Sequence, residues 1–428
     1  MAEHIGFSVW SLWSVMVLFM PTEVYGISVA DKFLIAATAT CTGALLRFPY
    51  SMATSRFGGR NWTVFSAAVL LVPVLATIWI LANPGQGLWV YLVCAALTGL
   101  GGGNFSSSMA NISFFFPKER KGSALGVNAG LGNLGVSVVQ FLSPLVVTAG
   151  IFGVFGGDAQ TIVKNGQTAQ VWTQNAAFIW VPWIALTALA AWFGMNDIAD
   201  ARASFAAQAA IFKRKHNWLM CVLYLGTFGS FIGYAAGFPL LIKSQFPSIN
   251  PLAYAWLGPL VGAVVRPFGG WLADKLGGAR VTLWNFIVMA IAVVGVTVFL
   301  PSGSNEGQFG GFFVCFLVLF LTTGIGNGST FRMIPVIFLT EAMRGVDKNN
   351  AAAVAQANKE GNTLGAATLG FTAAMAAYGG FFIPKSYGSS IALTGAPHAA
   401  LWCFAAFYLV CIAVTWWYYA RKHAEMPC

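Results

Sequence analysis

Two arginines interrupt long apolar stretches of this sequence. Arg47 lies midway through TCTGALLRFPYSMA, and Arg266 lies midway through VGAVVRPFGGWLA. Neither is close enough to the end of its apolar run to reach water comfortably, and charge at membrane depth is costly and usually functional. A guanidinium keeps its proton in proteins, and its planar fork suits two-point recognition of an oxyanion. The pair therefore predicts an anion site; arginines bonded to backbone carbonyls at helix contacts are the alternative.

The two arginines occupy equivalent positions in an internal repeat. When Arg47 is placed over Arg266, an offset of 219 residues, the Gly-Gly pair at 58–59 meets the pair at 277–278. The elements RFPYSMATSRFGGRNWT and RPFGGWLADKLGGARVT thus follow the second predicted span of each half as tight hinges. A parallel repeat of six spans is typical of a two-lobed secondary transporter, which binds substrate between its repeats. Symmetry therefore predicts that both arginines face one substrate site.

The helices that hold these arginines must lie in lipid. Of 428 residues, 57% are hydrophobic and 8% are charged, whereas a soluble domain carries about 25% charged residues. The 23 Lys and Arg residues are scattered between apolar runs, which argues against nucleic acid as a partner. We predict an all-α membrane protein, because each apolar run has roughly the 20 residues that cross a bilayer. The twelve predicted spans are 5–20, 31–54, 63–82, 88–116, 123–150, 176–194, 217–242, 250–273, 283–301, 309–338, 352–378 and 398–420.

Basic residues orient the predicted spans. The even-to-odd loops and the C-terminus hold 15 Lys and Arg residues, and the opposite loops hold only Lys32, Lys164, Lys243 and Lys385. This bias predicts that both termini are cytoplasmic. The loop at 196–216 divides the chain into an N-terminal six-helix lobe, 1–195, and a C-terminal six-helix lobe, 217–428. Because the first span is short, we expect the natural start to lie upstream of Met1.

Other chemistry is sparse in the predicted spans. We find no Asp, Glu, His or Lys clearly inside the middle of any span, and we assign Arg332, Lys359 and Glu360 to span boundaries. Two buried positive charges without a buried acid call for an anion and leave no evident proton carrier. The seven cysteines show no metal-ligand spacing, so we predict neither a metal nor a cofactor. An enzyme acting on a lipid-linked substrate would need a cluster of acid–base or nucleophilic groups near an interface, and the sequence has none.

Glycines and asparagines recur in the fourth and fifth predicted spans, in GLGGGNFSSSMANISFFFP and GSALGVNAGLGNLGVSVVQ. Glycine in a helix costs about 1 kcal/mol relative to alanine, and close contact between helices explains most of these glycines. Amides inside a span need partners, which could be a neighbouring helix or a small anion. For Asn128 and Asn133 the two interpretations weigh equally, and for Asn104 the helix contact is favoured.

These motifs resemble those of a known family. The stretch GGGNFSSSMANISFFFPKERKGSALGVNAGLGNLGVSVVQ is similar to the nitrate signature of the nitrate/nitrite porters, within the major facilitator superfamily, and most of all to their NarK-type members. The repeated Gly-Gly element resembles the inter-helix motif of that superfamily. The resemblance covers nearly the whole chain, including FGMNDIA, YLGTFGSFIG and GGFFIPKSYGSSIALTG. In the eleventh span, GAATLGFTAAMAAYGG has fewer glycines than the fifth span.

The resemblance implies a fold, a function and a site. The fold is the major facilitator fold, twelve helices in two lobes with alternating access. We predict a transporter in the bacterial inner membrane, with no enzymatic activity, that exchanges nitrate for nitrite in nitrate assimilation; proton-coupled nitrate symport is the alternative. Its partners would be these anions and membrane lipid, and we expect a monomer. In the implied site the arginines hold nitrate at the midplane, two phenylalanines sandwich it, and a tyrosine and an asparagine donate hydrogen bonds. The predicted site residues are Arg47, Arg266, Phe105, Phe228, Tyr224 and Asn133, together with Asn128 from the analysis above.

Overall fold

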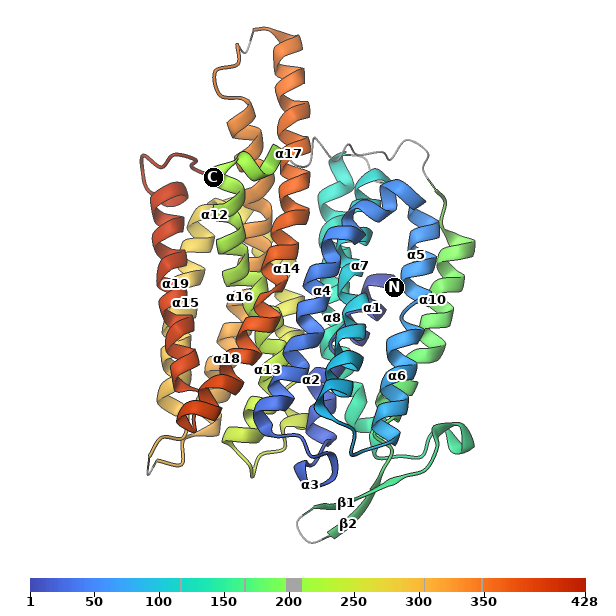
Figure 1. Ribbon diagram of the computed structural model, residues 1–428. Coiled ribbons are helices and arrows are strands. Elements are labelled where there is room, and N and C mark those ends of the chain that lie inside the picture. Colours follow the sequence, from blue (N-terminus) through green and yellow to red (C-terminus); the bar gives the residue numbers. More distant parts are fainter. Residues whose placement is uncertain (116–117, 165–166, 198–209, 304, 348) are drawn as a thin grey trace. The chain divides into compact units, whose positions relative to one another are not determined.

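The computed structural model describes residues 1–428 apart from 116–117, 165–166, 198–209, 304 and 348 (Figure 1). The described chain is almost entirely helical, as predicted, and forms two compact units. Unit 1 comprises Met1–Ala201, Ile232–Ala263 and Gly380–Ala400, and unit 2 comprises Arg202–Phe231, Val264–Gly379 and Leu401–Cys428. These units have different boundaries from the predicted lobes at 1–195 and 217–428, which stay a prediction. Most of the predicted linker at 196–216 lies outside the described residues.

The predicted membrane spans are largely present as helices. Eleven helical segments of the described chain are long and apolar enough to cross a membrane. The predicted span at 250–273 corresponds to α14 (Leu257–Leu276), which is less apolar because it carries Arg266, Asp274 and Lys275. The chain is therefore a multi-pass membrane protein.

The predicted end of the eleventh span, residue 378, was wrong. Instead of stopping at residue 378, the apolar segment continues through α17 (Ala351–Ala377) and α18 (Gly379–Thr394). Lys385, which we had placed in a loop, lies in α18 with an exposed side chain. A single lysine on an exposed helix face does not end a helix, because its charged head can extend towards water while its stem packs on the apolar surface.

Unit 1 is built around α7, which packs against α1 and α4; α1 also packs against α8. The loop between the fifth and sixth predicted spans contains a two-stranded antiparallel hairpin, with Gln160 opposite Val171 (Figure 1). The sequence analysis did not predict this hairpin. The elements of unit 1 are α1 (Ala2–Trp10), α2 (Leu12–Met16), η1 (Val17–Phe19), α3 (Thr22–Tyr25), α4 (Val29–Phe57), α5 (Gly59–Ala68), α6 (Leu71–Ala82), α7 (Leu88–Phe115), α8 (Lys118–Val147), η2 (Gly153–Gly156), β1 (Gln160–Lys164), β2 (Gln167–Val171), α9 (Asn175–Phe178), α10 (Trp180–Gly194), most of α13 (Ser230–Gln245), η5 (Pro251–Ala253), the first part of α14, and α18.

Unit 2 is built around α16, which packs against α15 and α17. Its first span contains a π-helical segment, η4, between two α-helices. Such segments insert an extra residue into a helix and are frequent at functional sites. The elements of unit 2 are η3 (Ala210–Lys213), α12 (Lys215–Tyr224), η4 (Leu225–Gly229), the second part of α14, α15 (Gly278–Phe299), α16 (Phe309–Ala342), α17, α19 (His398–Thr415) and the π-helical η6 (Trp416–Ala420).

The repeated Gly-Gly elements form the tight turns that the sequence predicted. Gly58 ends α4 with a φ of 87°, and Gly277 separates α14 from α15 with a φ of 90°. Only glycine adopts this left-handed backbone readily. In unit 1 the carboxylate of Asp197 accepts the backbone N–H of Arg60 at 2.7 Å, and so caps the start of α5. Both turns are therefore fixed by backbone geometry.

Several glycines lie at helix contacts, as the sequence analysis proposed. A methyl group on Gly43 would overlap the indole of Trp10, and one on Gly101 would overlap the backbone of Gly6. The glycines of α4 and α7 thus let α1 approach closely. The Trp10 Nε1 then donates to the carbonyl of Ala39 at 2.8 Å, which fixes α1 against α4.

Neighbouring glycines on α14 provide a matched test of such contacts in unit 2. A methyl group on Gly269 would lie 2.6 Å from the Cα of Ile325 on α16, whereas one on Gly270 would meet nothing within 4 Å. We expect Gly269→Ala to destabilise the purified protein by about 1–3 kcal/mol, because a backbone contact cannot yield. Gly270→Ala should leave stability unchanged or raise it by about 1 kcal/mol. Thermal unfolding in detergent measures both, and equal melting temperatures would contradict the contact.

Candidate functional site

Arg47 is the most deeply buried charged side chain among the described residues of unit 1. Its side chain is 0% exposed, and its Nε donates to the carbonyl of Gly102 on α7 at 3.2 Å. The guanidinium carbon lies 4.6 Å from the ring centre of Phe105 and 5.3 Å from that of Trp10. Cation–π contacts and a carbonyl replace part of the water that a guanidinium would bind in solution. They hold the group in one place inside an apolar unit.

Two aromatic residues of α1 extend this site beyond the predicted set. Phe7 lies 6.1 Å from Phe105, and Trp10 packs edge-on against Phe7 at 5.2 Å. Both rings are buried and surround Arg47 together with Phe105. The sequence analysis did not single them out, because aromatic residues are common in membrane spans. Their role follows only from the packing of α1 against α7.

Arg266 is the corresponding buried charge of unit 2. It is 4% exposed, and its Nη2 donates to the hydroxyl of Tyr224 at 3.2 Å. Tyr224 stacks on Phe228 with ring centres 5.4 Å apart and an interplanar angle of 15°. The π-helical segment η4 begins directly after Tyr224 and contains Phe228. Within unit 2 the structure thus brings together three of the predicted site residues.

A further aromatic residue lies at Arg266. The ring centre of Phe331 on α16 is 5.5 Å from the guanidinium carbon and 5.8 Å from the ring centre of Tyr224. Each buried arginine therefore has an aromatic ring from the fourth helix of its own half, Phe105 on α7 and Phe331 on α16. The predicted set contained Phe105 but not Phe331.

Three of the buried asparagines whose amide groups have no hydrogen-bond partner among the described residues lie on α7, α8 and α16. They are Asn104 and Asn133 in unit 1 and Asn327 in unit 2, and none is more than 2% exposed. A buried amide without a partner costs about 1–3 kcal/mol. Such an amide is available to a bound ligand, so Asn133 remains a predicted donor. Asn327 was missed, although GGGN at 101–104 and GIGN at 324–327 repeat the same pattern in the two halves.

Asn128 differs from these three, because it bonds to neighbouring helices. Its Nδ2 donates to the carboxylate of Glu3 on α1 and, at 3.0 Å, to the hydroxyl of Ser108 on α7. Of the two interpretations left open for Asn128, the helix contact is the one observed. A role in binding substrate stays a prediction.

Glu3 is a buried acid that the sequence analysis overlooked. Its side chain is 2% exposed and accepts hydrogen bonds from Ser108 and Asn128. It lies in a segment, Ala2–Phe19, that is apolar enough to cross a membrane, whereas the predicted span began at residue 5. The acidic residue directly before the apolar run was the available signal. The expectation of a site without a nearby acid is therefore not met in unit 1.

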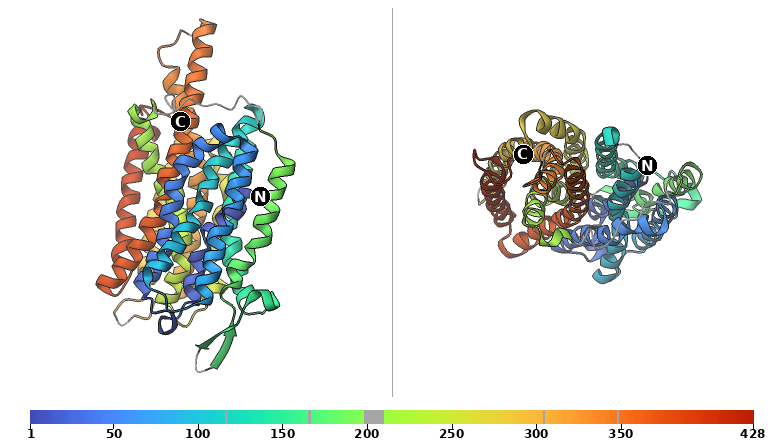
Figure 2. Two further views of the ribbon diagram at one scale, coloured as in Figure 1. Left: turned by 45° about the vertical axis from the view of Figure 1, so that its right-hand side comes forward. Right: turned by 90° about the horizontal axis from the view of Figure 1, so that it is seen from above.

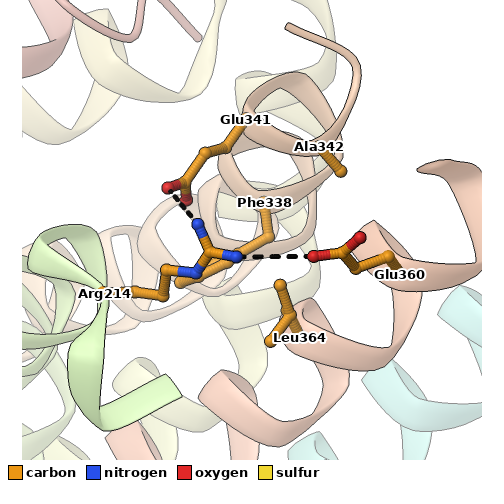
Figure 3. A pocket seen from close by; sticks show the side chains of 6 residues that line it. All are labelled: Arg214, Phe338, Glu341, Ala342, Glu360 and Leu364. Atoms are coloured by element: carbon orange, nitrogen blue, oxygen red, sulfur yellow. Dashed lines mark hydrogen bonds and ion pairs between the residues drawn. The ribbon is translucent and has the colours of Figure 1, made fainter. Parts of the chain in front are cut away.

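Two of the charges assigned to span boundaries, Arg332 and Glu360, form ion pairs in unit 2. Arg214 lies 3.2 Å from Glu341 and 3.4 Å from Glu360, and the three line a small pocket (Figure 3). Arg332 lies 2.7 Å from Asp274. All five side chains are at least 24% exposed, and partly exposed pairs contribute about 0–1 kcal/mol each. The pocket is acidic, which makes it a poor anion site. Within the described chain, no group of three or more His, Cys, Asp or Glu side chains could hold a metal ion.

Comparisons with known proteins bear on the family and the fold of the chain. The family model described as Major Facilitator Superfamily matches residues 5–368. The chain is 47% identical to the nitrate/nitrite transporter NarU of Salmonella typhimurium over 98% of this chain and 89% of that protein. It is 38% identical to the probable nitrate/nitrite antiporter NarK2 of Thermus thermophilus over 99% of this chain and 91% of that protein. The solved xylose transporter XylE from E. coli has the same fold, with a TM-score of 0.63, 12% identity and coverage of 97% and 95%.

Proposed function

The chain belongs to the nitrate/nitrite porter family of the major facilitator superfamily, and from this premise we propose that it transports nitrate and nitrite across the bacterial inner membrane. The observation that carries the proposal is the pair of buried arginines, Arg47 and Arg266, each set among aromatic rings. A buried positive charge is costly without a counter-ion. A small anion supplies one.

The surroundings of the arginines support a planar anion. A guanidinium can donate two parallel hydrogen bonds to two oxygens of nitrate. The faces of Phe105 and Phe228 suit a flat ion, while Tyr224 and Asn133 can donate further hydrogen bonds. The internal repeat supports the assignment of both arginines to one anion. We propose that all six residues bind it, and that Asn128 acts through its contact with Glu3.

Exchange is the mode that the relatives support best, because one of them is named a probable nitrate/nitrite antiporter. In this mode nitrate enters as nitrite leaves, and neither anion is chemically converted. We further propose a monomer surrounded by lipid with both termini in the cytoplasm, as the 15-to-4 distribution of basic residues suggests. Arg202 and Lys348, two residues of that distribution, lie outside the described residues.

Proton-coupled nitrate symport is a second candidate, and the buried Glu3 favours it. A carboxyl group can take up and release a proton, which an arginine cannot do in a protein. The two modes need not exclude one another, since exchange and net uptake can share one anion site.

Uptake into proteoliposomes tests the proposed function. Vesicles holding the purified full chain receive isotope-labelled nitrate outside, with or without nitrite inside, and without a pH gradient. We expect rapid uptake only into vesicles that contain nitrite. A protein that takes up no nitrate under either condition would contradict the proposal, and empty liposomes provide the background.

The two phenylalanines, Phe105 and Phe228, should affect the discrimination between anions more than the strength of anion binding. We expect Phe105→Ala and Phe228→Ala to raise competition by chlorate, a pyramidal ion, relative to nitrate. Flat faces exclude a pyramidal ion by shape, whereas the arginines supply most of the attraction. The loss of a few contacts changes discrimination by about 1–3 kcal/mol, or about 10- to 200-fold. Inhibition of labelled nitrate uptake by chlorate measures the effect. Phe65→Ala, which removes an exposed ring on α5, is the control. Unchanged competition would show that the rings do not contact the anion.

A further inference from the structure

Glu3 and Arg47 both contact α7. The hydroxyl of Ser108, which donates to Glu3, also lies 3.1 Å from the carbonyl of Phe105, whose ring contacts Arg47. Ser108 lies six positions after Gly102, the carbonyl partner of Arg47, which corresponds to about 9 Å along a helix. The N-terminus lies partway along the helices of unit 1 and not at their ends (Figures 1 and 2). The carboxylate is therefore inside the unit, about two helical turns from the arginine's carbonyl contact.

The surroundings of the Glu3 side chain suit a carboxyl group. Ser108 and Asn128 both donate to its Oε2, and Gly132 on α8 leaves room for the side chain, because a methyl group there would overlap the carboxyl. Donors that point at one oxygen stabilise the ionised form. Burial favours the neutral form. The opposing effects suit a group that changes its protonation state during function.

Ionisable groups that could act on Glu3 lie on the helices that pack against α1. Helix α1 packs against α2, α4, α5, α7, α8 and α10. Among the described side chains, α2, α10 and α8 from residue 124 onward carry no ionisable group, and on α1 itself the neighbours are His4 and the amino group of Met1. The ionisable side chains of the other elements are Asp31, Lys32, Cys41, Arg47, Tyr50 and Arg56 on α4, Arg60 on α5, and Tyr91 and Cys94 on α7. Of these groups, Arg47 is the one whose side chain donates a hydrogen bond to the backbone of α7, the helix that also donates to Glu3 through Ser108.

We infer that Glu3 binds the proton that accompanies an anion held at Arg47. The inference rests on the proposed function and adds a coupling residue to it. An anion at Arg47 repels the ionised carboxylate, so anion binding favours protonation and protonation favours anion binding by the same factor. If the two charges are taken to be separated by the rise from Gly102 to Ser108, about 9 Å, an effective dielectric constant near 20 means that each alters the other's binding equilibrium about 20-fold. In net uptake, Glu3 takes one proton from the outside water with each nitrate and releases both inside.

The same group explains how exchange and net uptake can coexist. When nitrate enters and nitrite leaves, Glu3 is protonated in both directions and no net proton crosses. When the cytoplasm offers no anion, the empty carrier returns with Glu3 ionised, and the carboxylate offsets the charge of Arg47. Glu3→Gln fixes the neutral form. It should turn the protein into a strict exchanger.

Proteoliposomes with a pH-sensitive dye inside test the inference, at a membrane potential clamped to zero. Nitrate added outside to anion-free vesicles, under an inward proton gradient, should acidify wild-type vesicles. In Glu3→Gln this nitrate-dependent acidification should be lost, while nitrate/nitrite exchange persists. Glu306→Gln, which alters an exposed carboxyl group, should behave as wild type. A Glu3→Gln variant that acidifies like wild type would overturn the inference and leave the proposed function intact. Wild-type vesicles that exchange no nitrate for nitrite would contradict both.

A second variant decides the matter if Glu3→Gln loses all flux. Asn128→Leu removes a donor to the ionised carboxylate, which favours the protonated form of Glu3. The midpoint of the pH dependence of net nitrate uptake should therefore move to higher pH. A midpoint that stays at the wild-type value would overturn the inference, and a shift to higher pH would support it.

Discussion

Arg47→Lys and Arg266→Lys should each reduce nitrate uptake about a hundredfold while the protein still inserts and folds. Each variant keeps the positive charge but loses the planar fork that donates to two oxygens. Truncating one partner of a buried, hydrogen-bonded charge pair costs about 2–5 kcal/mol, and about 3 kcal/mol corresponds to a factor of roughly a hundred. Both side chains are almost completely buried, so water cannot replace the missing donors.

Two partly exposed arginines provide matched controls for these variants. Arg60 is paired with Asp197 in unit 1, and Arg332 is paired with Asp274 in unit 2. Their lysine variants should transport nitrate as wild type does, because a partly exposed ion pair tolerates a point charge. Uptake is compared at equal amounts of protein with the same thermal stability. Near wild-type uptake by Arg47→Lys or Arg266→Lys would remove that arginine from the site.

Nitrite on the opposite side should accelerate nitrate efflux about a hundredfold at acidic pH. In the proposed site, two buried guanidiniums leave a net positive charge when no anion is bound, and a buried net charge costs several kcal/mol. A bound anion offsets this charge in the loaded carrier. A barrier difference of about 3 kcal/mol changes a rate by more than a hundredfold. In acid Glu3 is neutral and cannot help, so the empty carrier should return slowly.

This acceleration should shrink as the pH rises. Once Glu3 has lost its proton, the ionised carboxylate offsets part of the charge, and the empty carrier returns faster. Efflux from nitrate-loaded vesicles into buffers with and without nitrite, at fixed membrane potential, gives the ratio at each pH. Equal efflux in both acidic buffers would mean that the empty carrier returns freely. The charge of the arginines would then not explain exchange.

Much of the fold could be predicted because its causes are local in the sequence. Long apolar runs give the membrane helices, and the repeat of Gly58 and Gly277 gives two turns with the same left-handed backbone. Arg47 and Arg266 stand out because a charge inside an apolar run has few structural explanations. The hairpin of β1 and β2 was missed, since its ten residues carry no apolar alternation and depend on pairing in space.

The remainder of the site depends on packing between helices. Trp10 and Phe331 look like any aromatic residue of a membrane span until α1 and α16 place them at an arginine. Glu3 looks like a residue outside the membrane until α7 and α8 enclose it. Asn128 illustrates the same limit, because its two interpretations could be separated only by identifying the atom it bonds.

The most direct measurement of the central claim counts both anions in one experiment. Vesicles loaded with nitrite receive isotope-labelled nitrate without a pH gradient and at zero membrane potential, and both pools are followed in time. An anion site shared by nitrate and nitrite predicts that one nitrite leaves for each nitrate that enters, and that Arg47→Lys and Arg266→Lys slow both fluxes equally. Nitrate that accumulates while the internal nitrite stays constant would contradict the account.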